Sequence, residues 1–303
     1  MHGPGLRRYT ENAGCTEAVQ PACPLSGCAV MIRDLIKEAG WGAHAAVHGV
    51  FAEAIARLYE HLQQPLVVYV VLAVLRDDLL RHMRYEEACV LPLYEAKVPD
   101  PLPPARADAY RRDHDLLRRR LEDLAVLSLR SGFEAVPPSM LQYGVSELDE
   151  LLEHHDEREV RYLYPVLEQV LSAQEQADVL GRLAETGMRD PGGVVDEARE
   201  LIGGSAFADL SARYRAWLEL RDAPADLRGQ SRAALFAPLP PAAVLEEVPA
   251  ASSLDRVLAR TLELSRRFLE NEVSDRKARV QAERRVDQAW RSLLGLVLGS
   301  VAR

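Results

Sequence analysis

The sequence has no long apolar run, few cysteines and no excess of positive charge, and each absence excludes a class of protein. No apolar stretch approaches the roughly 18 to 20 residues that a membrane-spanning helix needs, and the N-terminal residues MHGPGLRRYTENAGC lack the apolar core of a signal peptide. The four cysteines are too few and too unevenly spaced for a disulfide framework. A net charge of −9 argues against nucleic acid as a general partner. We therefore expect a cytoplasmic protein with no membrane span.

Strand-like alternation is also rare, and from about residue 31 onward the pattern is helical, which predicts an all-α fold. Composition divides the chain into an irregular arm with Cys15, Cys23 and Cys28 (1–30), a helical bundle (31–190), short helices with an Ala/Pro-rich linker (191–253), and a long amphipathic helix (254–303). The spacing of the three cysteines matches no strong zinc or iron–sulfur signature. The apolar end of the last helix must be buried, either on this chain or on a protein partner such as a second copy.

The bundle region contains two copies of one sequence motif, which we call the repeated phrase. Residues 82–92 read HMRYEEACVLP and residues 155–165 read HDEREVRYLYP, so each has a His, a Glu four residues later and a Pro six residues after that Glu. A lone His precedes each copy, His48 before the first and His114 before the second. Packing alone rarely explains an internal repeat that duplicates metal-binding residue types. The repeat therefore predicts a symmetric metal site built from two helical hairpins.

Counting from the predicted breaks between helices tests whether these residues can meet. The expected helices cover about 31–64, 65–97, 105–130 and 140–171, with a shorter one at 174–185. Residues i and i+4 share a helix face, and at about 1.5 Å of rise per residue the ligands lie within one turn of the same height. The predicted set is His48, His82, Glu86, His114, His155 and Glu159. Six ligands are more than one tetrahedral zinc ion can use, and they suit two divalent ions. Imidazole ligands are compatible with iron, zinc, copper or nickel.

With these residues in place, the chain resembles the hemerythrin-like (HHE cation-binding) family over about residues 40 to 185. The resemblance implies an up-down-up-down four-helix bundle that holds a non-haem di-iron site, with Glu86 and Glu159 as bridging carboxylates. It implies two iron ions as the cofactor, with zinc or manganese as less favoured metals. It also implies a small diatomic ligand or a peroxide as the partner of the site.

One position departs from the family pattern. Oxygen-carrying members have a second His one turn away on the third helix, whereas here Tyr110 and Arg118 stand one turn on either side of His114. His44 lies one turn before His48, and antiparallel geometry places it level with Glu86. We therefore add His44 as a fifth histidine, with Tyr110 as its counterpart at the mouth of the site. A half-exposed His44 near the start of its helix is the alternative.

Three polar residues lie one position away from a ligand. His154, Glu87 and Asp113 are offset by about 100° on an α-helix, so we expect each to be solvated. A contact with a ligand imidazole is the alternative for His154 and Asp113.

Three classes of function are compatible with these predictions. The first is a protein that binds or senses dioxygen, nitric oxide or related oxidants, or handles iron. The appended C-terminal segment, which has no catalytic constellation of its own, favours it over an enzyme. The alternative is a di-iron oxidase or peroxidase with Tyr110 or a cysteine as redox partner, and a structural metal-binding bundle is a third reading.

Overall fold

Every regular element in the described part of the chain is a helix, which confirms the all-α prediction. The computed structural model describes residues 42–187, 189–222, 229–237, 251–270 and 276–301. Cys15, Cys23, Cys28, the arm of residues 1–30 and most of the predicted linker lie outside the described residues. In the part that is described, no helix combines the length and the apolar character that crossing a membrane requires.

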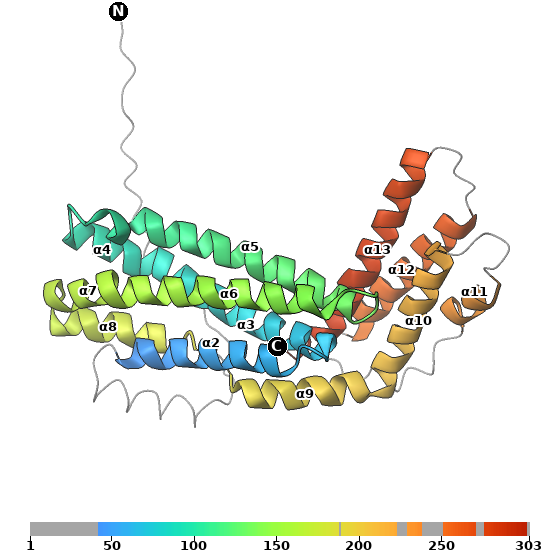
Figure 1. Ribbon diagram of the computed structural model, residues 1–303, viewed down its shortest axis with the longest axis horizontal. Helices are drawn as coiled ribbons and strands as arrows, with labels where there is room; N and C mark the ends of the chain where they lie inside the picture. Colours follow the sequence, from blue (N-terminus) through green and yellow to red (C-terminus); the bar gives the residue numbers. More distant parts are fainter. Residues whose placement is uncertain (1–41, 188, 223–228, 238–250, 271–275, 302–303) are drawn as a thin grey trace, which may run out of the picture.

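Four long helices pack in a ring and lie side by side along the length of the molecule (Figure 1). They are α2 (Gly42–Glu60), α3 (Pro65–Tyr85), α5 (Ala107–Ser131) and α6 (Pro138–Arg158). Helix α3 contacts α2 and α5, and α6 closes the ring by contacting α5 and α2. Prolines occupy the first turns of α3 and α6, where the missing N–H group has no intrahelical partner to lose.

The two copies of the repeated phrase interrupt the helices that carry them with a wider turn. The π-helical turns η1 (Glu86–Val90) and η3 (Glu159–Leu163) join α3 to α4 (Leu91–Lys97) and α6 to α7 (Tyr164–Val170). In each, the N–H of the residue before the proline donates to the carbonyl of the Glu five residues earlier. A proline lacks an N–H donor and its ring crowds the preceding turn. The Pro of each phrase therefore accounts for a wide turn that begins at the Glu.

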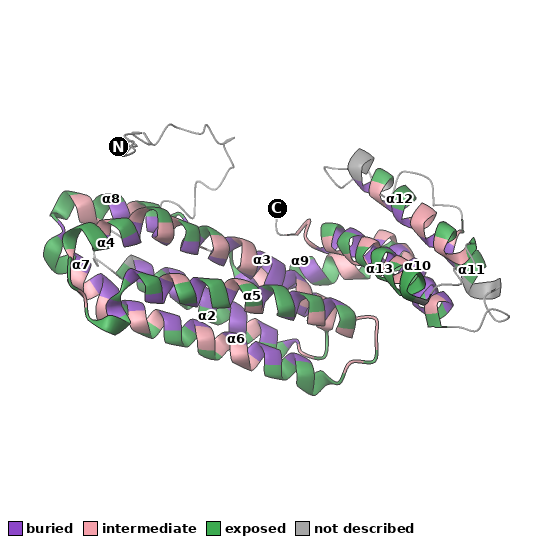
Figure 2. Cartoon of the chain, turned by 90° about the horizontal axis from the view of Figure 1, so that it is seen from above, coloured by how far each residue is buried: buried purple, intermediate pink, exposed green. Residues whose placement is uncertain are grey.

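The polar layer around these turns divides the hydrophobic core in two. One buried cluster contains Met83 of α3 and Leu117 of α5, and the other contains Val90 of η1 and Tyr110 of α5. Glu86 and His114 fall between the two clusters in the sequence of these segments. Figure 2 shows the buried faces turned inward along the whole ring. The apolar residues above and below therefore enclose the polar layer.

Further helices continue from the ring. They are α8 (Ala173–Ala184), α9 (Pro191–Gly203), α10 (Ser205–Asp222) and α11 (Gly229–Leu235), and a short 3-10 turn, η2 (Pro103–Ala105), precedes α5. Helix α8 begins with a capping box in which the side chains of Ser172 and Glu175 each bond the other's backbone N–H. It packs on α2 and η1, while α9 packs on α2 and α3. The C-terminal helices thus contact the ring partly through α9 and partly through direct contacts, such as Tyr214 of α10 with Phe133 and Gly295 of α13 with Tyr69.

The prediction of one long helix over residues 254–303 is wrong. The structure has two helices there, α12 (Ala251–Glu270) and α13 (Arg276–Leu298), and they pack against each other. An antiparallel pair lets each apolar face cover the other, which a single extended helix does not allow. The apolar end of α13 is buried on this chain, with Trp290, Leu293 and Leu294 fully inaccessible to solvent.

Candidate metal centre

The structure brings all seven predicted ligands into one buried layer. His44 and His48 come from α2, His82 and Glu86 from the α3–η1 junction, His114 from α5, and His155 and Glu159 from the α6–η3 junction. All seven side chains are buried, and the most accessible of them is only 6% exposed. His44 is 2% exposed, so the structure supports the buried interpretation of this residue over a half-exposed one.

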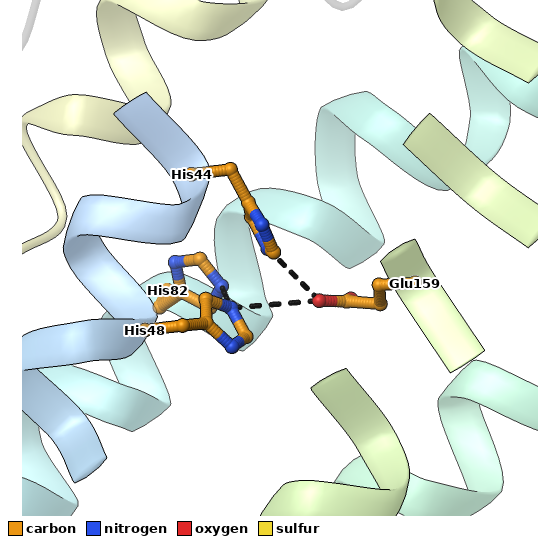
Figure 3. Close-up of side chains that lie close together, drawn as sticks. All are labelled: His44, His48, His82 and Glu159. Carbon is orange, nitrogen blue, oxygen red and sulfur yellow. Dashed lines mark hydrogen bonds and ion pairs between the residues drawn. The ribbon is translucent and has the colours of Figure 1, made fainter. Parts of the chain in front are cut away.

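Within the layer, the ligand atoms form two groups that share one carboxylate. The first contains His44, His48, His82 and Glu159, and Figure 3 shows their side chains converging from three segments of the chain. The second contains Glu86, His114, His155 and Glu159. In each group the ligand atoms all lie within 4.8 Å of one another. Both groups could hold a metal ion, and Glu159 belongs to both.

Each carboxylate extends its two oxygens toward different histidines. Glu159 places Oε2 3.0 Å from His44 Nε2 and 3.5 Å from His48 Nε2, and Oε1 3.3 Å from His155 Nε2. Glu86 likewise places Oε1 3.3 Å from His82 Nε2 and Oε2 3.3 Å from His114 Nε2. Both glutamates therefore span the two histidine groups, as bridging carboxylates of a two-metal site would.

The hydrogen-bonding state of the layer also fits a metal. Four buried atoms that point into it make no hydrogen bond, although each lies 3.3 Å from another of the four: Glu86 Oε2, His114 Nε2, His155 Nε2 and Glu159 Oε1. An unsatisfied buried polar atom normally costs free energy, and burying two carboxylates together costs more. Cations between them would remove both costs, so the donor set fits divalent metal ions.

The buried charges act on one another. Burial opposes ionisation of Glu86, but His82 and His114 outweigh it and hold the pKa of this carboxyl well below its usual range. Burial and the neighbouring charge of Glu86 hold the pKa of Glu159 well above its usual range. Burial lowers the pKa of His44 and lowers that of His155 to about 4. These two imidazoles are neutral at pH 7, the form that binds a metal ion.

Three ligand histidines are fixed by partners on their outer nitrogen. His48 Nδ1 lies 3.0 Å from Asp156 Oδ1, and His114 Nδ1 lies 2.8 Å from Glu87 Oε1. His82 Nδ1 lies 2.9 Å from Thr186 Oγ1. Because a carboxylate can only accept a hydrogen bond, Nδ1 of His114 carries the proton and its Nε2 is left to face the layer.

Two of the three neighbouring residues contradict the expectation that they are solvated. Glu87 accepts a hydrogen bond from Arg118 at 2.6 Å besides its contact with His114. Asp113 is 7% exposed, accepts from Arg158 at 2.8 Å and lies 3.9 Å from His155 Nδ1. The sequence offsets were misleading because neighbouring helices supply arginines that fix these carboxylates. His154 is exposed, as expected.

Tyr164 was missed by the sequence reasoning. Its hydroxyl donates to Glu86 Oε1 at 2.6 Å, and its ring lies 3.9 Å from the ring of His44, between centroids. The sequence did contain a sign of its role. Tyr164 stands directly before the Pro of the second copy, at the position where the first copy has the apolar residue Leu91. Tyr110 is fully buried and not at a mouth, and its hydroxyl donates to the carbonyl of Arg158 at 3.4 Å.

Replacing Tyr164 by Phe is expected to destabilise the metal-free protein. Its hydrogen bond ends on an ionised carboxylate, and such bonds contribute about 1.5–3 kcal/mol. Tyr110→Phe, which removes a longer bond to a neutral carbonyl, is expected to cost less than about 1 kcal/mol. Urea unfolding with a chelator present measures both free energies. Equal losses in the two variants would show that the bond to Glu86 adds nothing of its own.

Comparison with known proteins tests the family resemblance of the sequence. Residues 44–135 match the family model described as the hemerythrin HHE cation binding domain. Residues 44–135 are thus similar to a hemerythrin HHE domain. The matched residues begin at His44 and include the first copy of the repeated phrase, whereas His155 and Glu159 lie beyond them. Comparison with curated proteins and with solved structures gave no significant match.

Proposed function

We propose that the four-helix ring is the up-down-up-down bundle of a hemerythrin-like protein and that its polar layer binds two iron ions. The observation that carries this proposal is the sharing of both glutamates between two histidine groups. A site for one ion would need no second carboxylate that reaches both groups. Imidazole and carboxylate together are a donor set that suits iron, with zinc or manganese as alternatives.

The two ions would have different ligands. His44, His48 and His82 would bind one ion and His114 and His155 the other, with Glu86 and Glu159 between them. Three imidazoles at one position and two at the other leave the second with fewer protein ligands. The site that completes its coordination with a small molecule is therefore the one on α5 and α6.

Two ferrous ions would supply electrons for binding dioxygen, nitric oxide or a related oxidant. The protein's own residues orient the imidazoles through Asp156, Glu87 and Thr186, and they keep bulk water away with apolar clusters on both sides of the layer. Such an enclosed site favours small ligands. We therefore propose binding or sensing of a diatomic ligand or a peroxide, with iron handling as a related role.

An oxidase or peroxidase is the second candidate, and one observation favours it. The hydroxyl of Tyr164 touches a bridging carboxylate, so a redox-active side chain stands at the site. Repeated consumption of peroxide by the iron-loaded protein would support the enzyme, whereas one stable adduct per site would support binding.

Metal analysis tests the proposal. We expect the protein, loaded with Fe²⁺ under anaerobic conditions and freed of excess metal, to hold two ions per chain and to change its visible absorption when dioxygen or nitric oxide is added. His155→Ala is expected to lose iron, because His155 is fully buried in the layer. His154→Ala changes the exposed neighbour and is expected to keep both ions. Retention of fewer than two ions by the wild-type protein, or of zinc alone, would overturn the di-iron proposal.

A further inference from the structure

One of the three residues that fix the ligand histidines comes from outside the four-helix ring. Thr186 follows α8 and lies beyond the residues that match the HHE domain. It is 5% exposed, and its hydroxyl donates to the carbonyl of Leu183 at 2.5 Å. A hydroxyl has one proton, so Thr186 Oγ1 accepts from Nδ1–H of His82 at 2.9 Å. His82 Nε2 then carries no proton, so it accepts from Nε2 of His48 at 3.1 Å and lies 3.3 Å from Glu86 Oε1.

The residues after Thr186 continue this contact toward the C-terminal helices. Gly187 lies against Val47, the residue before the ligand His48. A Cβ atom added to Gly187 would be in ordinary van der Waals contact with the Val47 side chain. Arg189 donates to the carbonyl of Val301 near the end of the chain and pairs with Glu197 of α9 at 3.4 Å. Asp190 caps α9 by accepting from the N–H of Gly193 at 2.7 Å. The connection between α8 and α9 therefore touches the metal layer at one end and holds α9 and the end of α13 at the other.

Charge also joins this connection to α3. Asp78 lies one turn before His82 on α3, is 6% exposed and pairs with Arg81 at 2.5 Å. Burial raises the pKa of Asp78, and the positive charges of Arg81 and Arg189 oppose that rise. Arg189 therefore favours the ionised form of Asp78 and also contacts the C-terminal residues.

We propose that Thr186 is a positioning residue for His82 and that the α8–α9 connection couples metal binding to the docking of α9 on the ring. This inference rests on the proposed metal binding. Helix α9 contacts α2 and α3 of the ring and also α10 and α13, so its docking contributes to how the C-terminal helices are held. A metal ion that fixes His82 fixes its partner Thr186 and the connection that follows. Because coupling is reciprocal, docking of α9 strengthens metal binding by the same factor.

Three variants separate this role from a general effect on folding. Thr186→Val removes the hydroxyl at almost constant volume, and Thr186→Ser restores it. Thr261→Val is the matched control, since Thr261 is 1% exposed in α12 and its hydroxyl bonds only to the carbonyl of Val257 at 2.8 Å among the contacts described. Circular dichroism establishes that each variant is folded before metal is added.

Titration with Fe²⁺ alone, under anaerobic conditions, measures the first part of the proposal. Loss of a group that orients a ligand histidine commonly lowers metal affinity about 10–100-fold. We expect a loss in this range for Thr186→Val, recovery in Thr186→Ser and no change in Thr261→Val. An unchanged affinity in Thr186→Val would overturn the positioning role. Failure of the wild-type protein to bind Fe²⁺ would instead overturn the proposed function together with this inference.

Amide hydrogen exchange measures the second part. In the wild-type protein, saturating Fe²⁺ is expected to slow exchange in α9 by about 5-fold or more, the lower range of measured couplings. In Thr186→Val at saturating Fe²⁺, this additional protection is expected to disappear from α9 but to persist in α5, which carries His114. Equal protection of α9 in both proteins, or none in the wild type, would overturn the coupling.

Discussion

Replacing Glu159 by Gln is expected to reduce bound iron from two ions per chain to one or none. Glu159 is the only residue among those described that belongs to both ligand groups, with one oxygen near His44 and His48 and the other near His155. An amide offers one acceptor oxygen and turns a donor NH₂ toward the other metal position. It also removes one of two negative charges that face the ions. The substitution therefore weakens the binding of both ions, although it alters the side-chain volume very little.

The stability of the metal-free variant separates a ligand from a structural residue. Glu159 is 1% exposed beside Glu86, so its carboxylate is costly to bury without a cation. We expect metal-free Glu159→Gln to unfold in urea at the same or a higher denaturant concentration than the metal-free wild type. Glu153→Gln, an exposed position on α6, is the matched control and is expected to keep two ions. Two bound ions in Glu159→Gln, measured by elemental analysis, would contradict the bridging role.

Residue spacing was enough to predict which side chains lie together in this layer. A His and a Glu four positions apart share a face of any α-helix, and helices joined by short breaks place equal counts at equal height. The layer formed by His82, Glu86 and His114 follows from that arithmetic alone. His44 followed from the same counting, and the structure places its Nε2 3.0 Å from Glu159 Oε2.

Contacts that depend on the packing of separate helices could not be counted in this way. Thr186 contacts His82 although the two are 104 residues apart in the sequence. The direction in which the chain turns before and after α8 decides this contact, and residue spacing does not predict that direction. Glu87 is drawn to His114 because Arg118 stands beside it on α5. Tyr164 had a visible signal in the unequal residues before the two prolines, but its bond to Glu86 depends on the wide turn η3. The residues that orient the ligands were therefore harder to predict than the ligands.

Replacing Phe51 by Ala is expected to produce the largest loss of stability next to the site. Phe51 is fully buried on α2, and its ring lies edge-on to His48 and His82, with centroids 5.8 and 5.5 Å apart. Removing a buried Phe ring commonly lowers the free energy of unfolding by about 3–5 kcal/mol. Urea unfolding in the presence of a chelator measures this loss without a contribution from bound metal.

The same variant is expected to weaken iron binding, because two ligand imidazoles lose the ring that limits their rotation. Ile55→Ala is the control: Ile55 lies one turn further along α2, is 2% exposed and belongs to the same cluster. It is expected to lose about 2–5 kcal/mol of stability while keeping its affinity for Fe²⁺, because Ile55 lies one turn farther than Phe51 from His44 and His48 on α2. Fe²⁺ titration below the unfolding range compares the two folded proteins. If affinity falls equally in both, iron binding depends on the overall stability of the bundle, and the support that Phe51 gives to His48 and His82 has no separate effect.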